Sequence, residues 1–189
     1  ALVQRELQDL YRGNPPEVFR VLAEALRLHI RPNIELLEVG CASGYYYEVL
    51  EYLLKTRIEY MGVDFSDAMI RLARSYYPST RFEVGDGGAL RFEDRSIPIV
   101  VSSCVLLHVQ EYAMHIAEAA RVSRKYVVFH RTPVLHAGGP VYYTKLAYGV
   151  ETLEIHFNEQ ALVEAFVRNG LSLAAINTHA ISWDAARGD

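Results

Sequence analysis

Two apolar runs of strand length place the strongest constraint on the fold of this chain. IPIVVSS (residues 97–103) and KYVVFH (125–130) do not alternate between apolar and polar side chains, which is typical of strands buried on both faces of a parallel sheet. Helical patterns separate these runs from similar ones, and this alternation predicts an α/β fold with a three-layer, doubly wound, mostly parallel sheet. We expect strands at residues 35–39, 59–63, 80–84, 97–102 and 126–130, and helices at 44–55, 67–76 and 111–123.

The two ends of the chain carry their own signals. Asn14 and the two prolines after it predict the start of a helix that runs to about residue 30 and is ended by Pro32. Asn158 predicts another capped helix, which ends near residue 170. Between them, residues 131–148 are rich in Gly, Pro and Tyr and have no clear period, so we expect an excursion over the edge or the active face of the sheet.

The last segment leaves two arrangements open. Residues 171–183 form a final strand or a tight antiparallel hairpin in the first arrangement. In the second, the antiparallel part is shortened, and residues 150–157, which have an alternating pattern, cover the edge of the sheet instead.

Composition and charge narrow the classes of function. The chain has 189 residues, enough for one domain, and its formal net charge of -4 gives no electrostatic reason to expect nucleic acid or an anionic membrane as a partner. No run approaches the roughly 20 apolar residues of a membrane span, and charges occupy the N-terminus where a signal peptide needs apolar residues. Cys41 and Cys104 suggest neither a disulfide framework nor a zinc site, so we expect a cytoplasmic protein without a metal.

The loop after the first expected strand holds the main functional signal. In LLEVGCASGYYYEVL (36–50) a carboxylate, Glu38, precedes a loop of small residues, and no Lys or Arg occurs from residue 32 to 54. A phosphate-binding P-loop needs a Lys after its last Gly, where this chain has Tyr45, and the dinucleotide fingerprint GxGxxG is not matched. The loop therefore favours a ligand without phosphate.

Three acids stand at or next to the carboxyl ends of three successive strands: Glu38, Asp64 and Asp86. This is the edge at which open parallel sheets bind ligands, and these charges suit a ligand with a ribose and a positive group. A nicotinamide dinucleotide is the alternative, because Asp64 lies about where a ribose-binding acid follows a dinucleotide loop, but it leaves Glu38 and Asp86 without a role. Asp64 can also be a turn or helix-cap residue alone.

The order and spacing of these segments resemble the class I S-adenosylmethionine-dependent methyltransferases. The first family motif, ExGxGxG, is similar to EVGCASG (38–44), although Ala42 stands where the middle Gly is usual. Further similar segments follow: VDFS (63–66), GDGGAL (85–90), IVVSSCVLLH (99–108), FNEQAL (157–162) and NGL (169–171). The resemblance covers most of residues 36–171 and implies a Rossmann-like domain that binds S-adenosylmethionine and releases S-adenosylhomocysteine.

The resemblance also implies a role for the residues of each segment. Gly40 and Gly44 let the backbone pass close to the cofactor, and Glu38 orders the loop or meets the methionyl end. Asp64 accepts hydrogen bonds from the ribose hydroxyls, and Asp86 receives the adenine amino group.

Two further side chains, Phe65 and Met69, are expected to pack on the adenine, with a place in the core as the alternative for Met69. Ala42 is tolerable in the loop if it keeps a negative φ. The full set of residues that the resemblance assigns to the cofactor is Glu38, Gly40, Cys41, Ala42, Gly44, Asp64, Phe65, Met69, Gly85, Asp86, Gly87 and Ser103.

Catalytic residues are harder to identify, because methyl transfer from a sulfonium is an in-line displacement that positioning and exclusion of water can drive. A general base is needed only if the acceptor must lose a proton. His108 and His130 are the candidates, with packing or helix capping as the alternative for His108. Arg131 has two readings, a contact to an acidic acceptor or an exposed strand end. Tyr11 and Arg12, between two N-terminal helices, are a possible lid.

We therefore expect a methyltransferase that acts on a small molecule at oxygen, nitrogen or carbon, with homodimerisation left open. A non-catalytic binding or interaction module with the same fold is the main alternative, and an NAD(P)-dependent oxidoreductase is the other. The single domain, residues 1–189, is expected to have an N-terminal helical cap (1–31), a cofactor-binding core (32–130), a variable excursion on the substrate side (131–157) and a C-terminal helix and strand (158–189).

Overall fold

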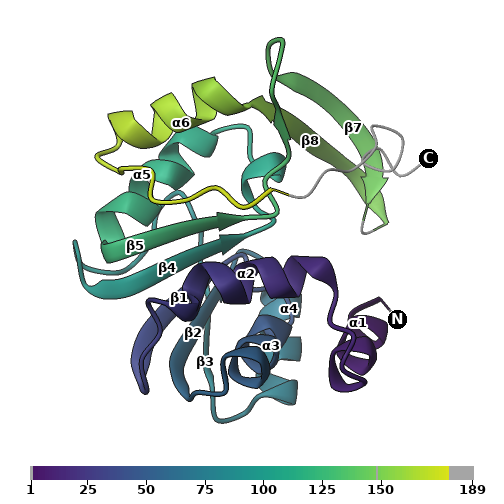
Figure 1. Ribbon diagram of the computed structural model, residues 1–189. Helices are drawn as coiled ribbons and strands as arrows, with labels where there is room; N and C mark the ends of the chain where they lie inside the picture. Colours follow the sequence, from purple (N-terminus) through teal and green to yellow (C-terminus); the bar gives the residue numbers. More distant parts are fainter. Residues whose placement is uncertain (1, 148, 179–189) are drawn as a thin grey trace.

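Five parallel strands form the central sheet, in the order β3-β2-β1-β4-β5 (Figure 1). The computed structural model of the chain describes residues 2–147 and 149–178. All five predicted strands are confirmed: β1 (Ile34–Val39), β2 (Ile58–Asp64), β3 (Arg81–Val84), β4 (Ile97–Ser103) and β5 (Ser123–His130). The chain reverses direction across the sheet between β1 and β4, and ligands of doubly wound folds bind at this switch point.

Helices cover both faces of this sheet and give the three predicted layers. Leu36 and Ile99 face one apolar cluster with residues of α2, α3 and α4, whereas Leu37 and Val100 face another with residues of α5. Neighbouring residues of one strand point to opposite faces, so both faces of β1 and β4 are apolar. The helices are α1 (Leu2–Tyr11), α2 (Glu17–Arg27), α3 (Tyr45–Leu54), α4 (Asp67–Tyr76), α5 (Tyr112–Val122), α6 (Glu159–Arg168) and the 3-10 turn η1 (Leu106–His108). None of these described helices is both long and apolar enough to cross a bilayer.

The predicted cap at Asn14 is wrong. Helix α2 begins at Glu17, and Pro16 occupies the N-cap position without a side-chain hydrogen bond. The backbone N–H of Asn14 instead donates to the carbonyl of Asp9, 2.9 Å away. The physical reason is the pair of prolines, since a residue before proline is disfavoured in the helical region and the start of the helix moves past both rings.

Residues 131–148, for which the sequence has no clear period, contain two strands of a second sheet. β6 (Val134–Leu135) and β7 (Val141–Ala147) flank β8 (Val150–Asn158), and β7 pairs with β8 in an antiparallel hairpin. Figure 1 shows this hairpin beyond the end of β5. The alternation of buried and exposed residues in β7 is not apparent from the sequence, because its half-buried face includes Lys145. This lysine forms an ion pair with the buried Glu154 of β8.

The described part of the last segment, residues 171–178, contains no strand, so the first arrangement is wrong for these residues, and the rest of it lies outside the described residues. Residues 150–157 do form a strand, β8, but in the described chain it pairs with β6 and β7 and not with β5. Ile155 and Phe157 pack with η1 and α6 in a third apolar cluster.

Asn158 ties this hairpin to α6, and its replacement tests how much that connection contributes. Its Oδ1 accepts from the backbone N–H of Ala161 at 2.9 Å, and its Nδ2 donates to the carbonyl of Gly138 at 2.8 Å. We expect Asn158→Ala to lower the free energy of unfolding by about 1–2 kcal/mol, measured by urea denaturation. Asn158→Asp keeps the cap and loses only the bond to Gly138, so it should cost less; an equal loss would contradict the assigned cap.

Candidate functional site

The loop between β1 and α3 packs so closely that two of its positions exclude a side chain. Gly40 has a φ of 80°, and a Cβ atom there would lie 2.0 Å from Cγ2 of Val105. Gly44 has a φ of 77°, and its Cβ atom would lie 2.5 Å from the ring of Phe82. Both positions therefore require glycine by backbone conformation and by space.

Ala42 in the same loop has a φ of 46°, so the condition of a negative φ, under which an alanine is tolerated without strain, is not met. The physical reason is tertiary: in this conformation its N–H donates to Oδ2 of Asp64 at 2.8 Å. The neighbouring Cys41 is buried, with its N–H bound to the carbonyl of Val63 at 3.1 Å and its thiol close to Gly62. Burial raises the pKa of the Cys41 thiol, so the thiol is protonated and packs in the core. Only the backbone of Cys41 is left to face a ligand in the loop.

Asp64 joins the first two loops at the carboxyl edge of the sheet. Besides the bond from Ala42, its Oδ1 accepts from the N–H of Ser66 at 2.9 Å. The helix cap of α4 is Ser66 and not Asp64, because the Ser66 hydroxyl accepts from the N–H of Met69. A carboxylate can accept about four hydrogen bonds, so two more are available to a ligand.

Glu38 lies beside this loop and is almost completely buried, at 1% exposure. The hydroxyl of Tyr60 donates to its Oε2, and the hydroxyl of Ser103 lies close to the carboxylate. Burial raises the pKa of Glu38 to about 7, although these two hydroxyls favour the charged form. Glu38 Oε1 and Ser103 Oγ are both buried without a hydrogen bond of regular geometry. Such atoms are rare in a folded protein, so a polar group that reached them would gain hydrogen bonds that the fold leaves incomplete.

Phe65 and Met69 lie where α4 begins and are accessible to a ligand. Phe65 is 85% exposed and Met69 is 39% exposed, so the alternative that Met69 is a core residue is wrong. Large apolar side chains with this exposure are apolar surface available for a flat ring.

The third acid, Asp86, shapes the loop after β3. Its Oδ1 accepts from the N–H of Gly88 at 2.8 Å. A Cβ atom at Gly87 would lie 2.5 Å from Nδ1 of His115, so the loop packs directly on that ring. Gly85 lies where the loop leaves β3, and its Cβ would lie 2.9 Å from Val63. A shallow depression beside this loop is lined by Val63, Glu83, Val84, Gly85, Asp86, Ala89, Leu90, Arg91 and Phe92.

The two predicted catalytic histidines are both engaged in the fold. His108 Nδ1 lies 2.8 Å from the carbonyl of Leu153, which docks η1 onto β8 and supports the packing alternative. His130 is buried, and its Nε2 lies 3.1 Å from the hydroxyl of Tyr46. Burial, with a smaller effect of Arg131, lowers the pKa of His130 to about 4. The ring is therefore neutral near pH 7.

The proposed lid residues are held at the flank of α3. The hydroxyl of Tyr11 donates to Oε1 of Glu48, and Tyr77 donates to Oε2 of the same carboxylate at 2.6 Å. Arg12, which follows α1, has a guanidinium nitrogen 3.8 Å from Oδ1 of Asp9 in that helix. These contacts fix α1 against α3.

His115, which the sequence did not identify, packs against the loop that contains Asp86 and Gly87. Its Nε2 lies 2.8 Å from Oγ of Ser102, and it is 2% exposed. Burial lowers its pKa to about 4, against an opposing effect of Asp86. The sequence signal was weak, because a single His in an amphipathic helix is compatible with either face.

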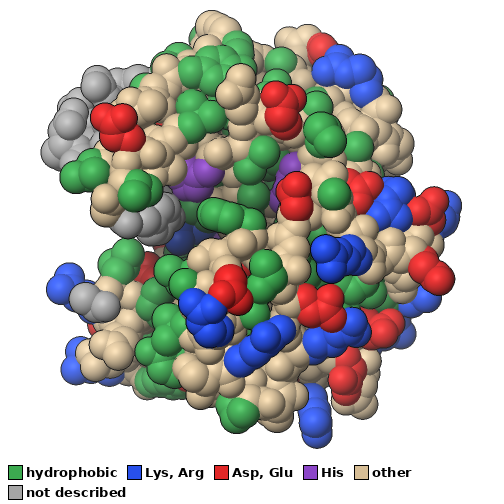
Figure 2. All heavy atoms as spheres, turned by 180° about the vertical axis from the view of Figure 1, so that it is seen from behind, with side chains coloured by type: hydrophobic (Ala, Val, Ile, Leu, Met, Phe, Trp, Pro, Cys, Tyr) green, Lys and Arg blue, Asp and Glu red, His purple; other side chains and the backbone are tan. Residues whose placement is uncertain are grey.

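Figure 2 shows histidine side chains among apolar ones beside a hollow in the surface. In the part of the chain that the structure describes, no three His, Cys, Asp or Glu side chains are grouped to hold a metal.

Comparison with known proteins identifies one family for this arrangement. Residues 37–129 match the family described as "Methyltransferase domain". A Mycolicibacterium smegmatis protein assigned as an S-adenosylmethionine-dependent methyltransferase is 30% identical over 95 residues, which is 50% of this chain and 36% of that protein. The chain spans about a third of the length of the curated relatives it matches, between 29% and 36%.

Solved structures have the same fold at low sequence identity. An S-adenosylmethionine-dependent methyltransferase from Mesorhizobium loti aligns with a TM-score of 0.63 and 19% identity over 87% of this chain and 88% of that one. The methyltransferase chain in a complex with the Haloferax volcanii activator Trm112 aligns with a TM-score of 0.63 and 22% identity over 92% of this chain and 75% of that one.

The conformation of Ala42 gives a stability prediction. A left-handed backbone costs a non-glycine residue roughly 1–2 kcal/mol, and the extra unfolded-state entropy of glycine offsets part of that gain. We expect Ala42→Gly to raise the free energy of unfolding by about 0.5–1 kcal/mol in urea denaturation. Ala68→Gly is the matched control inside α4 and should lower it by a similar amount; a destabilising Ala42→Gly would contradict the assigned strain.

The buried titratable groups predict how stability changes with pH. Because His115 and His130 have pKa values near 4 in the fold and 6.5 as model values, the unfolded chain binds two more protons between these pH values, and this stability is lost as pH falls. The pKa of Glu38 is raised from 4.5 to about 7, so its contribution is lost as pH rises through that range.

These three groups together give one net proton between pH 4.5 and 6.5, so they contribute a rise of about 1.4 kcal/mol per pH unit to the free energy of unfolding. His115→Gln removes one of the two histidine contributions and should lower the measured slope by about 1.4 kcal/mol per pH unit in urea denaturation at several pH values. An unchanged slope would show that His115 is not held neutral.

Proposed function

Because this chain belongs to the class I S-adenosylmethionine-dependent methyltransferases, we propose that it binds S-adenosylmethionine and moves its methyl group to a small-molecule acceptor at oxygen, nitrogen or carbon. The observation that carries the proposal is the pair of buried polar atoms beside the first loop. Glu38 Oε1 and Ser103 Oγ have no regular hydrogen-bond partner, although Tyr60 satisfies the other oxygen of Glu38. A polar cofactor group such as the ammonium fits this place.

The rest of the site agrees with the parts of that cofactor. Asp64 keeps acceptor capacity for ribose hydroxyls after its two backbone bonds. Asp86 is exposed at the edge of the shallow depression after β3, where it can accept from an adenine amino group. Phe65 presents an accessible ring for stacking. Phosphate, by contrast, would face Glu38 and Asp64 without a basic residue in the loop, which disfavours a dinucleotide.

When bound, S-adenosylmethionine supplies a methyl group on a sulfonium, which is already a good leaving group. The chain then has to bind the cofactor and the acceptor, orient them in line and exclude water, and these effects are enough for the transfer. Glu38 has a pKa near 7, so an ammonium brought next to it would favour its charged form.

The contacts of the two histidines argue against a side chain that acts as general base in this site. His108 is bound to a backbone carbonyl, and His130 is bound to Tyr46 with a pKa near 4, at which an imidazole is a poor base near neutral pH. We therefore propose catalysis by proximity and desolvation, with the hairpin of β7 and β8 as part of the substrate-side region (131–157). Homodimerisation stays a prediction.

The first test is titration calorimetry with S-adenosylmethionine, S-adenosylhomocysteine and NADH. We expect both sulfur nucleosides to bind and NADH not to bind. Binding of NADH alone would favour the oxidoreductase alternative. Binding of the cofactor with no demethylated product, across a broad panel of acceptors, would favour the non-catalytic module.

Phe65→Ala is the sharpest change to the cofactor site. Stacking of a base on an aromatic ring contributes about 1–3 kcal/mol, so the variant should bind S-adenosylhomocysteine roughly tenfold or more weakly in calorimetry. Because the Phe65 side chain is exposed, the melting temperature of the variant should equal that of the wild type. Asp64 is a poorer choice, since it also holds two loop amides.

Tyr76→Ala is the matched control. Tyr76 is also an exposed aromatic residue of α4, at the other end of the helix, and is 58% exposed. Its removal should leave the affinity unchanged, and an equal loss in both variants would place the adenine elsewhere.

A further inference from the structure

The carboxyl ends of β4 and β5 have an unusual backbone. Cys104 follows β4 with a φ of 57°, and Arg131 follows β5 with a φ of 56°. The N–H of Cys104 donates to the carbonyl of His130 at 2.9 Å, so the two left-handed residues are held side by side. Left-handed backbone is unfavourable for residues with a side chain, and such strain concentrates at functional sites.

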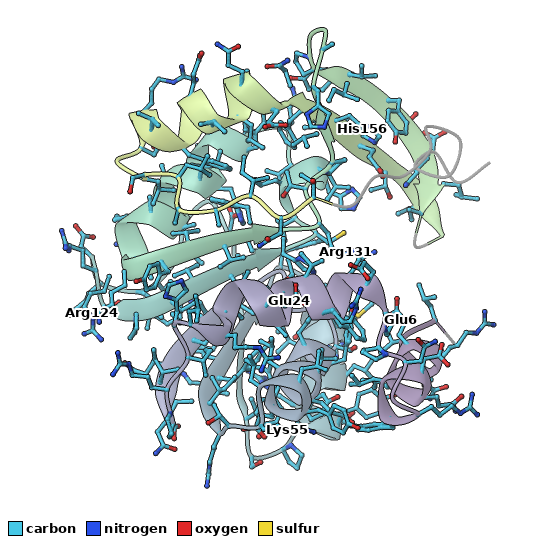
Figure 3. The ribbon with its side chains drawn as sticks, in the orientation of Figure 1. Glu6, Glu24, Lys55, Arg124, Arg131 and His156 are labelled. Atoms are coloured by element: carbon cyan, nitrogen blue, oxygen red, sulfur yellow. The ribbon has the colours of Figure 1, made fainter. Side chains whose placement is uncertain are left out.

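The guanidinium of Arg131 lies among polar aromatic groups and not in an ion pair. Its neighbours are Tyr46, whose hydroxyl lies 3.1 Å from Nε2 of the adjacent His130, and Tyr45 and Cys104. Among the salt bridges of residues 2–147 and 149–178, none involves Arg131. The acid that faces it is Glu6 of α1, which interacts with it at longer range (Figure 3). Most of the five N–H donors of this guanidinium therefore have no anionic partner in the described chain.

This guanidinium is also close to the first cofactor loop. Tyr45 and Tyr46 begin α3 directly after Gly44. A Cβ atom at Gly40 would lie 3.5 Å from the carbonyl oxygen of Ser103, the residue before Cys104. The loop contains no Lys or Arg from residue 32 to 54, so a carboxylate that binds here must find its positive partner on another element.

We infer that Arg131, held beside Tyr46, forms a carboxylate-binding site at the carboxyl ends of β4 and β5. The inference rests on the proposed function, because two ligands of that reaction carry this group: the methionyl end of the cofactor and an acidic acceptor. A guanidinium presents a planar pair of N–H donors that matches a carboxylate, and the neighbouring Tyr45 and Tyr46 place this one beside the loop that ends at Gly44.

The test uses Arg131→Gln, which removes the charge, and Arg131→Lys, which keeps the charge and loses the paired donors. Arg95→Gln is the matched control, because Arg95 is also an arginine with a left-handed backbone, at a φ of 52°, and it precedes β4 at the opposite end of that strand. Melting temperatures measured by circular dichroism show whether each variant is folded.

Two pairs of probes distinguish the source of the carboxylate. S-adenosylhomocysteine carries the amino-acid part, and 5′-methylthioadenosine lacks it. Benzoate and benzamide differ in the same way as stand-ins for an acceptor, and they are titrated into protein saturated with S-adenosylhomocysteine.

If the site serves the cofactor, Arg131→Gln should weaken S-adenosylhomocysteine at least tenfold and 5′-methylthioadenosine less than twofold. If it serves the acceptor, both nucleosides should bind the variant normally, and the wild-type preference for benzoate over benzamide should disappear. Arg131→Lys should lie between Arg131→Gln and wild type, and Arg95→Gln should match wild type.

A folded Arg131→Gln variant that changes neither pair of affinities would overturn the inference. A wild-type protein that binds neither nucleoside would contradict the proposed function instead, so the two failures can be told apart.

Discussion

The site depends on the two hydrogen bonds that end at the carboxylate of Asp64. One comes from the N–H of Ala42 at 2.8 Å and the other from the N–H of Ser66 at 2.9 Å. They connect the loop that starts α3 to the loop that starts α4, so the positions of both helix starts are linked through one side chain. The left-handed backbone at Ala42 follows from this link, because it directs the amide to Asp64. Stability and ligand geometry therefore depend on the same contacts.

Charge in the site is distributed so that the protein provides mainly acceptors. Glu38, Asp64 and Asp86 lie at the carboxyl edge of three neighbouring strands, while His115 and His130 are neutral near pH 7 because burial lowers their pKa. A ligand that carries positive charge and hydroxyl donors complements this arrangement. The buried Glu38, with a pKa near 7, is the group whose charge such a ligand would change most.

The sequence was a good guide where the signal is local. The strands were predictable because both faces of β1 and β4 are apolar, and the three acids were predictable because the end of a strand can be read from the residues on either side. The left-handed backbone of Ala42 was not, since the partner that favours it is 22 residues away. His115 was missed for the same reason: its role depends on a close approach to Gly87, which no pattern in α5 records.

Of the β7–β8 hairpin the sequence marked only β8, and the chemistry of the hairpin explains why β7 was missed. On one face Lys145 Nζ lies 2.7 Å from Oε2 of Glu154, and the hydroxyl of Tyr143 lies 2.8 Å from Nε2 of His156 (labelled in Figure 3). Glu154 and His156 are buried although they are polar, so the usual alternation of apolar and polar residues does not mark this face. Buried polar pairs add little net stability, because desolvation opposes their attraction, but they penalise any register that separates the partners. A hairpin fixed in this way keeps its register through polar pairs on one face. On the other face Ile155 and Phe157 of β8 pack with η1 and α6, whereas Tyr142, Thr144 and Leu146 of β7 are exposed. Changes at these β7 positions therefore cost little stability, which suits a region proposed to lie on the substrate side.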